Sequence, residues 1–186
     1  MGKLKIYLAS SWRNETAVIS VAKCLRAHGF EVDCFCDQFS GRIGFNIATC
    51  LEETGASIYD VDAITALLHP AVQEKFQVAY AEDKKWLDWA NCVVMLMPCG
   101  KSAHLEAGYM KGKGGLFYIY WMSDLPMGEF DNMYQFADGM FRPNQIRDLI
   151  NELLWQDDRY VRNGAIKSKS AGVAIIPNRK QADNKE

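Results

Sequence analysis

The sequence predicts an α/β fold in which helices cover both faces of a parallel sheet of five strands. Short apolar runs suited to buried strands alternate with longer stretches whose apolar residues recur at helical spacing. The chain opens with a strand at Lys5–Ser10, a helix over Asn14–His28 and a second strand at Glu31–Cys36. A strand–helix–strand opening predicts parallel strands joined by right-handed crossovers.

The later elements follow from the same two patterns. The run Cys92–Met97 is apolar throughout, as expected for a central strand covered on both faces. The other expected elements are a helix at Pro70–Ala90, a helix capped by Ser102 that runs to Lys111, strands at Leu116–Trp121 and Phe136–Phe141, and a closing helix at Pro143–Trp155. We interpret residues 1–156 as one domain and the polar residues 157–186 as a tail.

Residues 37–69 form a long connection after the second strand. Glycines are scattered through it, and the only element expected there is a short helix starting near Asp60. A connection of this length at the end of a strand usually contributes to a functional site.

The composition argues against several classes of function. The chain has 186 residues, of which 49% are hydrophobic, so a sizeable core can be buried. Its net charge of −2 argues against a nucleic-acid polymer as partner, because such surfaces are usually basic. No apolar run is long enough to span a bilayer, and no long apolar region follows the first residues, so we expect a cytoplasmic protein without a signal peptide.

The six cysteines are expected to be reduced thiols in that compartment. Cys34 and Cys36 lie two residues apart on an expected strand, but no second Cys or His pair stands at metal-ligand spacing. We therefore expect neither a metal nor a cofactor.

Polar clusters follow the expected strands at the points where ligands bind in open parallel sheets. One cluster, Ser10 to Arg13, follows the first strand, and a second, Gly100 to Glu106, follows the central strand. The long connection from Asp37 onward forms the third.

Glu106 is the candidate nucleophile. It lies early in a helix whose amino end faces the expected site, and the helix dipole and nearby amides favour its ionised form. An ionised carboxylate in a ligand cleft can attack a sugar carbon. The alternative is that Glu106 only caps helix amides.

Asp83 is the candidate general acid. On the expected long helix it continues an apolar stripe at steps of three and four residues, which predicts a buried position. Burial would raise the pKa of its carboxyl group, as a general acid requires. The alternatives are a cap or a salt bridge to Lys84 or Arg13.

Gly100, Lys101 and Ser102 at a helix start could cradle a phosphate or a sugar hydroxyl, and Arg13 could contact a phosphate with two hydrogen bonds. The triplet is not a P-loop, because the upstream glycine of that motif is missing. His104 is interpreted as a surface helix residue rather than a base.

Three segments together resemble the nucleoside 2-deoxyribosyltransferase family, which includes nucleoside 5′-monophosphate N-glycosidases. They are Ile-Tyr-Leu-Ala-Ser-Ser-Trp-Arg-Asn from Ile6, Glu-Asp-Lys-Lys-Trp-Leu from Glu82 and Pro-Cys-Gly-Lys-Ser-Ala-His-Leu-Glu-Ala-Gly-Tyr from Pro98. The resemblance covers roughly residues 4 to 122, and the last segment is its most specific part. It implies a flavodoxin-like sheet and a homodimer or larger homo-oligomer.

The resemblance also implies roles for individual residues. Glu106 would attack the anomeric carbon and form a glycosyl-enzyme intermediate, Asp83 would assist the departing base, and Tyr7 would orient the glutamate. Ser11 and Arg13 match positions that bind a 5′-phosphate in the nucleotide-cleaving members. Ser10, Gly100 and Ser102 complete the predicted substrate-binding set, with Ser102 near the phosphate or 5′-hydroxyl group.

One departure from the family bears on the reaction. The transferases carry an aspartate six residues before the nucleophile, where it holds the base, and this chain has Gly100 there. The difference favours hydrolysis of the intermediate over base exchange.

The leading hypothesis is an enzyme that cleaves or exchanges the N-glycosidic bond of a nucleoside or nucleoside 5′-monophosphate. A second hypothesis keeps the glutamate but changes the substrate, to NAD or to that of a phosphoribohydrolase. A third is a nucleotide-binding module without turnover.

Overall fold

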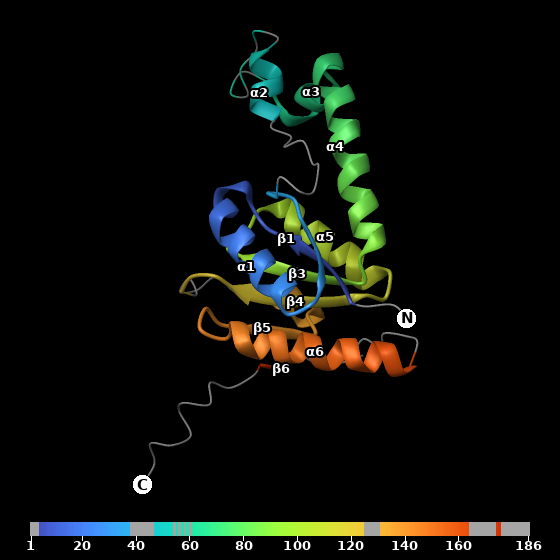
Figure 1. Cartoon of the computed structure of the whole chain (residues 1–186). Coiled ribbons are helices and arrows are strands. Elements are labelled where there is room, and N and C mark those ends of the chain that lie inside the picture. The colour runs from blue at the N-terminus through green and yellow to red at the C-terminus, as the bar shows by residue number, and fades with distance from the viewer. Residues whose placement is uncertain are drawn as a thin grey trace.

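A computed structural model describes residues 4–37, 47–53, 55, 57, 59, 61–124, 131–163 and 174–175. It contains one parallel sheet with the strand order β2-β1-β3-β4-β5-β6 (Figure 1). The strands are β1 (Lys5–Ala9), β2 (Glu31–Cys34), β3 (Cys92–Met97), β4 (Leu116–Trp121), β5 (Gly139–Phe141) and β6 (Ala174–Ile175). The predicted five-stranded parallel sheet and flavodoxin-like arrangement are confirmed, and the two-residue β6 extends the sheet at the β5 edge.

Helices cover both faces of the sheet, as predicted. On one face α1 (Glu15–Ala27) and α6 (Ile146–Asn163) pack over side chains that include Leu8, Val94 and Tyr118. On the other face α4 (Pro70–Trp89) and α5 (Lys101–Gly112) pack over the alternate residues of the same strands, among them Tyr7, Met95 and Ile119. The two-residue period of the strands therefore separates two apolar cores.

Several element bounds differ from the predicted ones. Helix α5 begins at Lys101 with Gly100 as its N-cap, so the prediction of Ser102 as the cap is wrong. Strand β5 begins at Gly139 and not at Phe136, which is the last residue of the 3-10 helix η3 (Asn132–Phe136). Helix α6 continues to Asn163, into the predicted tail, and Asp157 there accepts a hydrogen bond from the Leu4 backbone N–H at 2.5 Å.

The connection predicted to be irregular contains α2 (Ile47–Glu52) and α3 (Ala63–Leu68). The helix expected near Asp60 is α3, whose amino end is capped by the Asp62 carboxylate. These two helices and the first half of α4 project from the sheet (Figure 1). They share a small core of Cys50, Leu51, Ala66 and Val72. Residues 38–46 of the connection lie outside the described residues.

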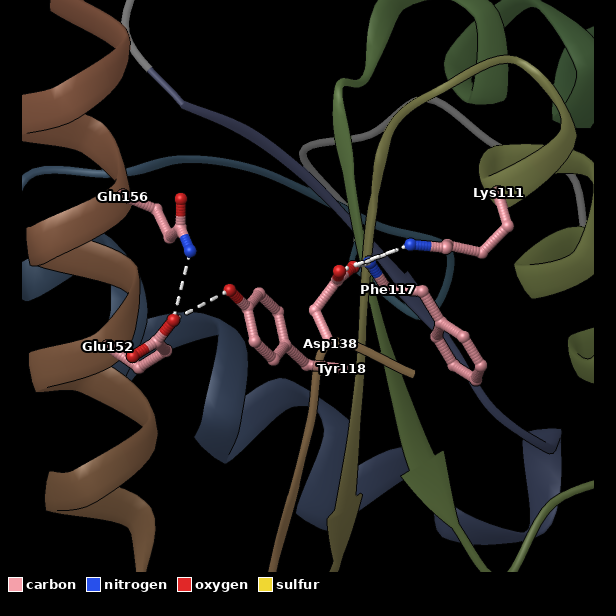
Figure 2. Close-up of polar contacts among 6 residues, drawn as sticks. All are labelled: Lys111, Phe117, Tyr118, Asp138, Glu152 and Gln156. Carbon is pink, nitrogen blue, oxygen red and sulfur yellow. Dashed lines mark hydrogen bonds and ion pairs between the residues drawn. The ribbon is translucent and has the colours of Figure 1, made fainter. Parts of the chain in front are cut away.

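A buried ion pair joins α5 to the sheet. Figure 2 shows the Asp138 carboxylate, just before β5, accepting hydrogen bonds from Lys111 Nζ at 3.0 and 3.1 Å and from the Phe117 backbone N–H at 2.8 Å. The Lys111 and Asp138 side chains are only 15% and 2% exposed. The single carboxylate thus ties α5, β4 and β5 together.

A second polar cluster joins α6 to the opposite face of β4. The Tyr118 hydroxyl donates to Glu152 Oε1 at 3.1 Å, and Gln156 Nε2 donates to the same oxygen at 2.9 Å (Figure 2). Burial, together with the nearby Cys92 and Glu152, raises the pKa of the Tyr118 hydroxyl. Tyr118 therefore stays neutral and keeps its proton for Glu152.

Replacing Lys111 with methionine should lower the free energy of unfolding by about 3 kcal/mol, because it leaves the buried Asp138 carboxylate without its lysine. Urea denaturation measures the change. The matched control is Arg162→Met, which removes the exposed i,i+4 pair with Asp158 and should cost less than about 0.5 kcal/mol. Equal losses in the two variants would contradict a special contribution from the buried pair.

Candidate active site

The candidate site lies at the carboxyl edge of the sheet between β1 and β3. The two strands pair in parallel, with Tyr7 opposite Val93 and Ala9 opposite Met95. The helix after β1 covers one face of the sheet and the helix after β3 covers the other, so the two connecting loops part. This is the topological switch point, where a crevice for a ligand forms in open α/β sheets.

The three predicted catalytic residues lie on the same side of the sheet. Tyr7 is 1% exposed and packs in the core shared with α4 and α5. Asp83 is half-buried on α4, so the fully buried position predicted for it is not found; it lies one turn before the core residue Leu87. Glu106 is half-buried on α5, one turn before the core residue Met110. The fold therefore places one candidate residue from each of three elements on the same side of the sheet.

Contacts between α4 and α5 hold the two helices together beside Asp83. Lys84 Nζ contacts Asp88 Oδ2 at 2.5 Å and lies 4.7 Å from the centroid of the Tyr109 ring. The Tyr109 hydroxyl donates to Asp88 Oδ1 at 2.5 Å. Lys84 thus pairs with Asp88, not in the salt bridge with Asp83 considered from the sequence.

Ser11 and Arg13 follow β1 in the turn that leads to α1. Ser11 caps the short 3-10 helix η1 (Trp12–Asn14), and its hydroxyl accepts from the Arg13 backbone N–H at 3.3 Å. The Arg13 side chain is exposed and makes no ion pair with the residues that the structure describes. Its guanidinium is therefore accessible to an anionic ligand at this edge.

An aromatic pair stands beside this turn. The exposed Trp12 ring meets the Phe35 ring edge-on, with centroids 5.0 Å apart. Phe35 follows β2, so the pair joins the loops after two neighbouring strands.

Gly100 and Ser102 lie at the amino end of α5, and both are exposed. Gly100 has an extended backbone, and a Cβ atom added there would meet no atom within 4 Å. The first-turn amides of a helix have no partners within the helix, so this end suits a phosphate or hydroxyl oxygen.

The Ser10 side chain connects the end of β3 with the turn that follows β1. Its hydroxyl donates to the Leu96 carbonyl at 2.9 Å and accepts from Asn14 Nδ2 at 3.1 Å. A substrate-binding role for Ser10 remains a prediction, and Asn14 is a residue that sequence reasoning missed.

His104 is exposed, in agreement with its interpretation as a surface helix residue. Its Nδ1 lies 3.0 Å from the Gly100 carbonyl and its Nε2 lies 3.2 Å from the Tyr134 hydroxyl. The two rings are stacked, with an angle of 22° between their planes. Sequence reasoning did not identify Tyr134, which η3 brings to the start of α5; Asp131, the N-cap of η3, was its only local signal.

Glu106 lies close enough to Cys99 for its charge to affect the pKa of the thiol. Burial and the neighbouring Glu106 charge raise the pKa of Cys99 to about 12. The thiol is therefore protonated at neutral pH and is a poor nucleophile there.

Comparison with family models, curated proteins and solved structures gave no match. Within the described ranges, no three His, Cys, Asp or Glu side chains are grouped to hold a metal ion. No helix in the described part of the chain is both long and apolar enough to cross a membrane.

Replacing Glu106 with glutamine should lower the pKa of Cys99 and speed its alkylation by iodoacetamide at pH 8, because it removes a negative charge that disfavours the thiolate. The rate is followed by mass spectrometry of the peptide that contains Cys99. The control is Asp88→Asn, which removes an exposed carboxylate held by Lys84. An alkylation rate unchanged from the parent chain would show that no Glu106 charge acts on the thiol.

Proposed function

We propose that this protein cleaves the N-glycosidic bond of a nucleoside or nucleoside 5′-monophosphate, with hydrolysis favoured over base transfer. The observation that carries the proposal is that Tyr7 lies on the face of the sheet covered by α4 and α5, the two helices that carry Asp83 and Glu106. A nucleophilic carboxylate and a second carboxyl group are the pair that retaining glycosyl chemistry requires.

In the proposed reaction the Glu106 carboxylate attacks the anomeric carbon and forms a glycosyl ester. The bond from that carbon to the base nitrogen breaks, and Asp83 donates a proton to the departing base. A water molecule then attacks the anomeric carbon and releases Glu106, while the Asp83 carboxylate takes up a proton from the water. The Tyr7 hydroxyl orients the nucleophile during both steps.

The substrate's 5′-phosphate is proposed to lie between the turn after β1 and the amino end of α5. The support is the exposed guanidinium of Arg13 on one side and the unpaired first-turn amides near Ser102 on the other. Ser11 belongs to the same turn as Arg13. Guanidinium binds phosphate well because its planar fork can donate two hydrogen bonds at once.

Gly100 supports hydrolysis over base exchange. With no side chain at this position, the amino end of α5 offers no carboxylate to hold an incoming base. Water is then the available acceptor for the glycosyl group.

We further propose that the chain works in the cytoplasm, and that it forms a homodimer or larger oligomer, which the family resemblance implies. Ile64, Leu67 and Leu68 support assembly, because they form an exposed stripe at i, i+3 and i+4 on α3.

The proposed function predicts release of free base from nucleoside 5′-monophosphates without an added acceptor base. Chromatography of a panel of ribo- and deoxyribonucleosides and their monophosphates measures this release. Glu106→Ala should reduce turnover at least about 10³-fold, because it removes the nucleophile. Full turnover by Glu106→Ala would refute the mechanism. Nicotinamide release from NAD alone would favour the NAD-cleaving alternative, and nucleotide binding without product would favour a binding module.

Replacing Gly100 with aspartate should raise the ratio of base exchange to hydrolysis, because it supplies a carboxylate at the position that holds the base in the transferases. The helix should tolerate the change, since the site is open and aspartate is a favourable N-cap. The ratio is measured by incorporation of a labelled acceptor base. Gly100→Asn is the matched control, equal in shape but uncharged. An unchanged ratio in Gly100→Asp would contradict the part assigned to Gly100.

A further inference from the structure

Asn14 is the last residue of η1, which runs directly into α1 at Glu15. The backbone N–H of Glu15 already bonds to the Trp12 carbonyl, and the Asn14 side chain makes no capping hydrogen bond to α1. The Asn14 amide is therefore available to groups outside its own helix.

The Asn14 amide instead connects the loops after β1 and β3. Its Nδ2 donates to the Pro98 carbonyl at 2.6 Å and to Ser10 Oγ at 3.1 Å. Ser10 Oγ in turn donates to the Leu96 carbonyl at 2.9 Å. Both hydrogens of the amide are therefore used, and the connection joins segments 84 residues apart in the sequence.

The turn that receives this connection leads directly into the helix that carries Glu106. Pro98 lies two residues before Gly100, the N-cap of α5, and both residues are exposed. On the α5 side the same turn is held by His104, whose Nδ1 lies 3.0 Å from the Gly100 carbonyl. On the β1 side the Asn14 amide holds this turn through its hydrogen bond to the Pro98 carbonyl.

We propose that Asn14 is a positioning residue that sets the separation between the Arg13 turn and the amino end of α5. This inference rests on the proposed function, in which Arg13 holds the phosphate and Glu106 attacks the sugar of the same molecule. The separation of the two loops then decides how close the anomeric carbon lies to the nucleophile. A displacement of about 1 Å at a reacting centre can reduce the rate about 100-fold.

Aspartate is the most informative substitution. It has the shape of asparagine but lacks the amide hydrogens, so it cannot donate to the Pro98 carbonyl. The Asn14 side chain makes no capping hydrogen bond that could be lost, and a negative charge is favourable at a helix amino end, so α1 should not be weakened. Asn14→Asp therefore separates the connection between the loops from the stability of the helix.

The experiment compares Asn14→Asp and Asn14→Ala with Ser20→Ala. Ser20 lies on the same helix and makes an exposed hydrogen bond to the Thr16 carbonyl at 2.8 Å, away from the loops. Three quantities are measured on the full chain: amide hydrogen exchange of the segment 99–106, kcat and KM for a nucleoside 5′-monophosphate, and the melting temperature.

In both Asn14 variants, exchange of residues 99–106 should become faster and kcat should fall about 10- to 100-fold. kcat should fall by a larger factor than KM rises, because Arg13 is intact and still binds the phosphate, whereas the position of the nucleophile acts in the transition state. Asn14→Asp should keep the melting temperature of the parent chain, and Ser20→Ala should match the parent in all three measurements.

Unchanged exchange in the Asn14 variants would overturn the proposal, because the amide would not hold the turn. Faster exchange with full kcat would also overturn it, because the turn would not position the nucleophile. An inactive parent chain would refute the proposed function, and hydrogen exchange alone would then decide whether Asn14 holds the turn.

Discussion

The parallel pairing of β1 with β3 determines where the candidate residues lie. It makes the residues after both strands neighbours, although more than eighty residues separate them along the chain. Because α1 and α5 cover opposite faces, the loops part and leave the carboxyl edge open. The same pairing puts Tyr7 on the face that α4 and α5 cover, so that the tyrosine lies beneath the two helices that carry the carboxylates.

Helix α5, which carries Glu106, is held by polar contacts at both ends. Near its carboxyl end Lys111 pairs with the buried Asp138, and Lys113 Nζ donates to the Leu87 carbonyl at 2.5 Å. At its amino end the preceding turn is held by Asn14 and by His104. Between the two ends, Ala103 and Ala107 let the helix lie close to the sheet. Support of this kind limits the movement of a side chain halfway along the helix.

Much of the fold could be predicted from short segments of the sequence, because a strand that is buried on both faces is apolar throughout. Strands β3 and β4 were predicted with their observed bounds, since a continuous apolar run is what a central parallel strand needs. The start of α4 at Pro70 was also predicted, because proline fits the first turn of a helix. Elements at the margins were less accurate: α2 and η3 were not predicted, and β5 was predicted too long.

The sequence by itself determined the sheet and its two helical layers, because strand and helix periods assign side chains to faces without reference to the rest of the chain. Asp83 and Glu106 were hypotheses drawn from their expected helices, and Tyr7 was a candidate through the family resemblance alone. The tertiary structure alone decided that Lys84 pairs with Asp88, that Gly100 caps α5, and that Tyr134 reaches His104. It also decided that the Asn14 amide binds Pro98 instead of its own helix. Each of these depends on a choice among competing hydrogen-bond or ion-pair partners, and only the packing of distant segments determines which partner comes within reach.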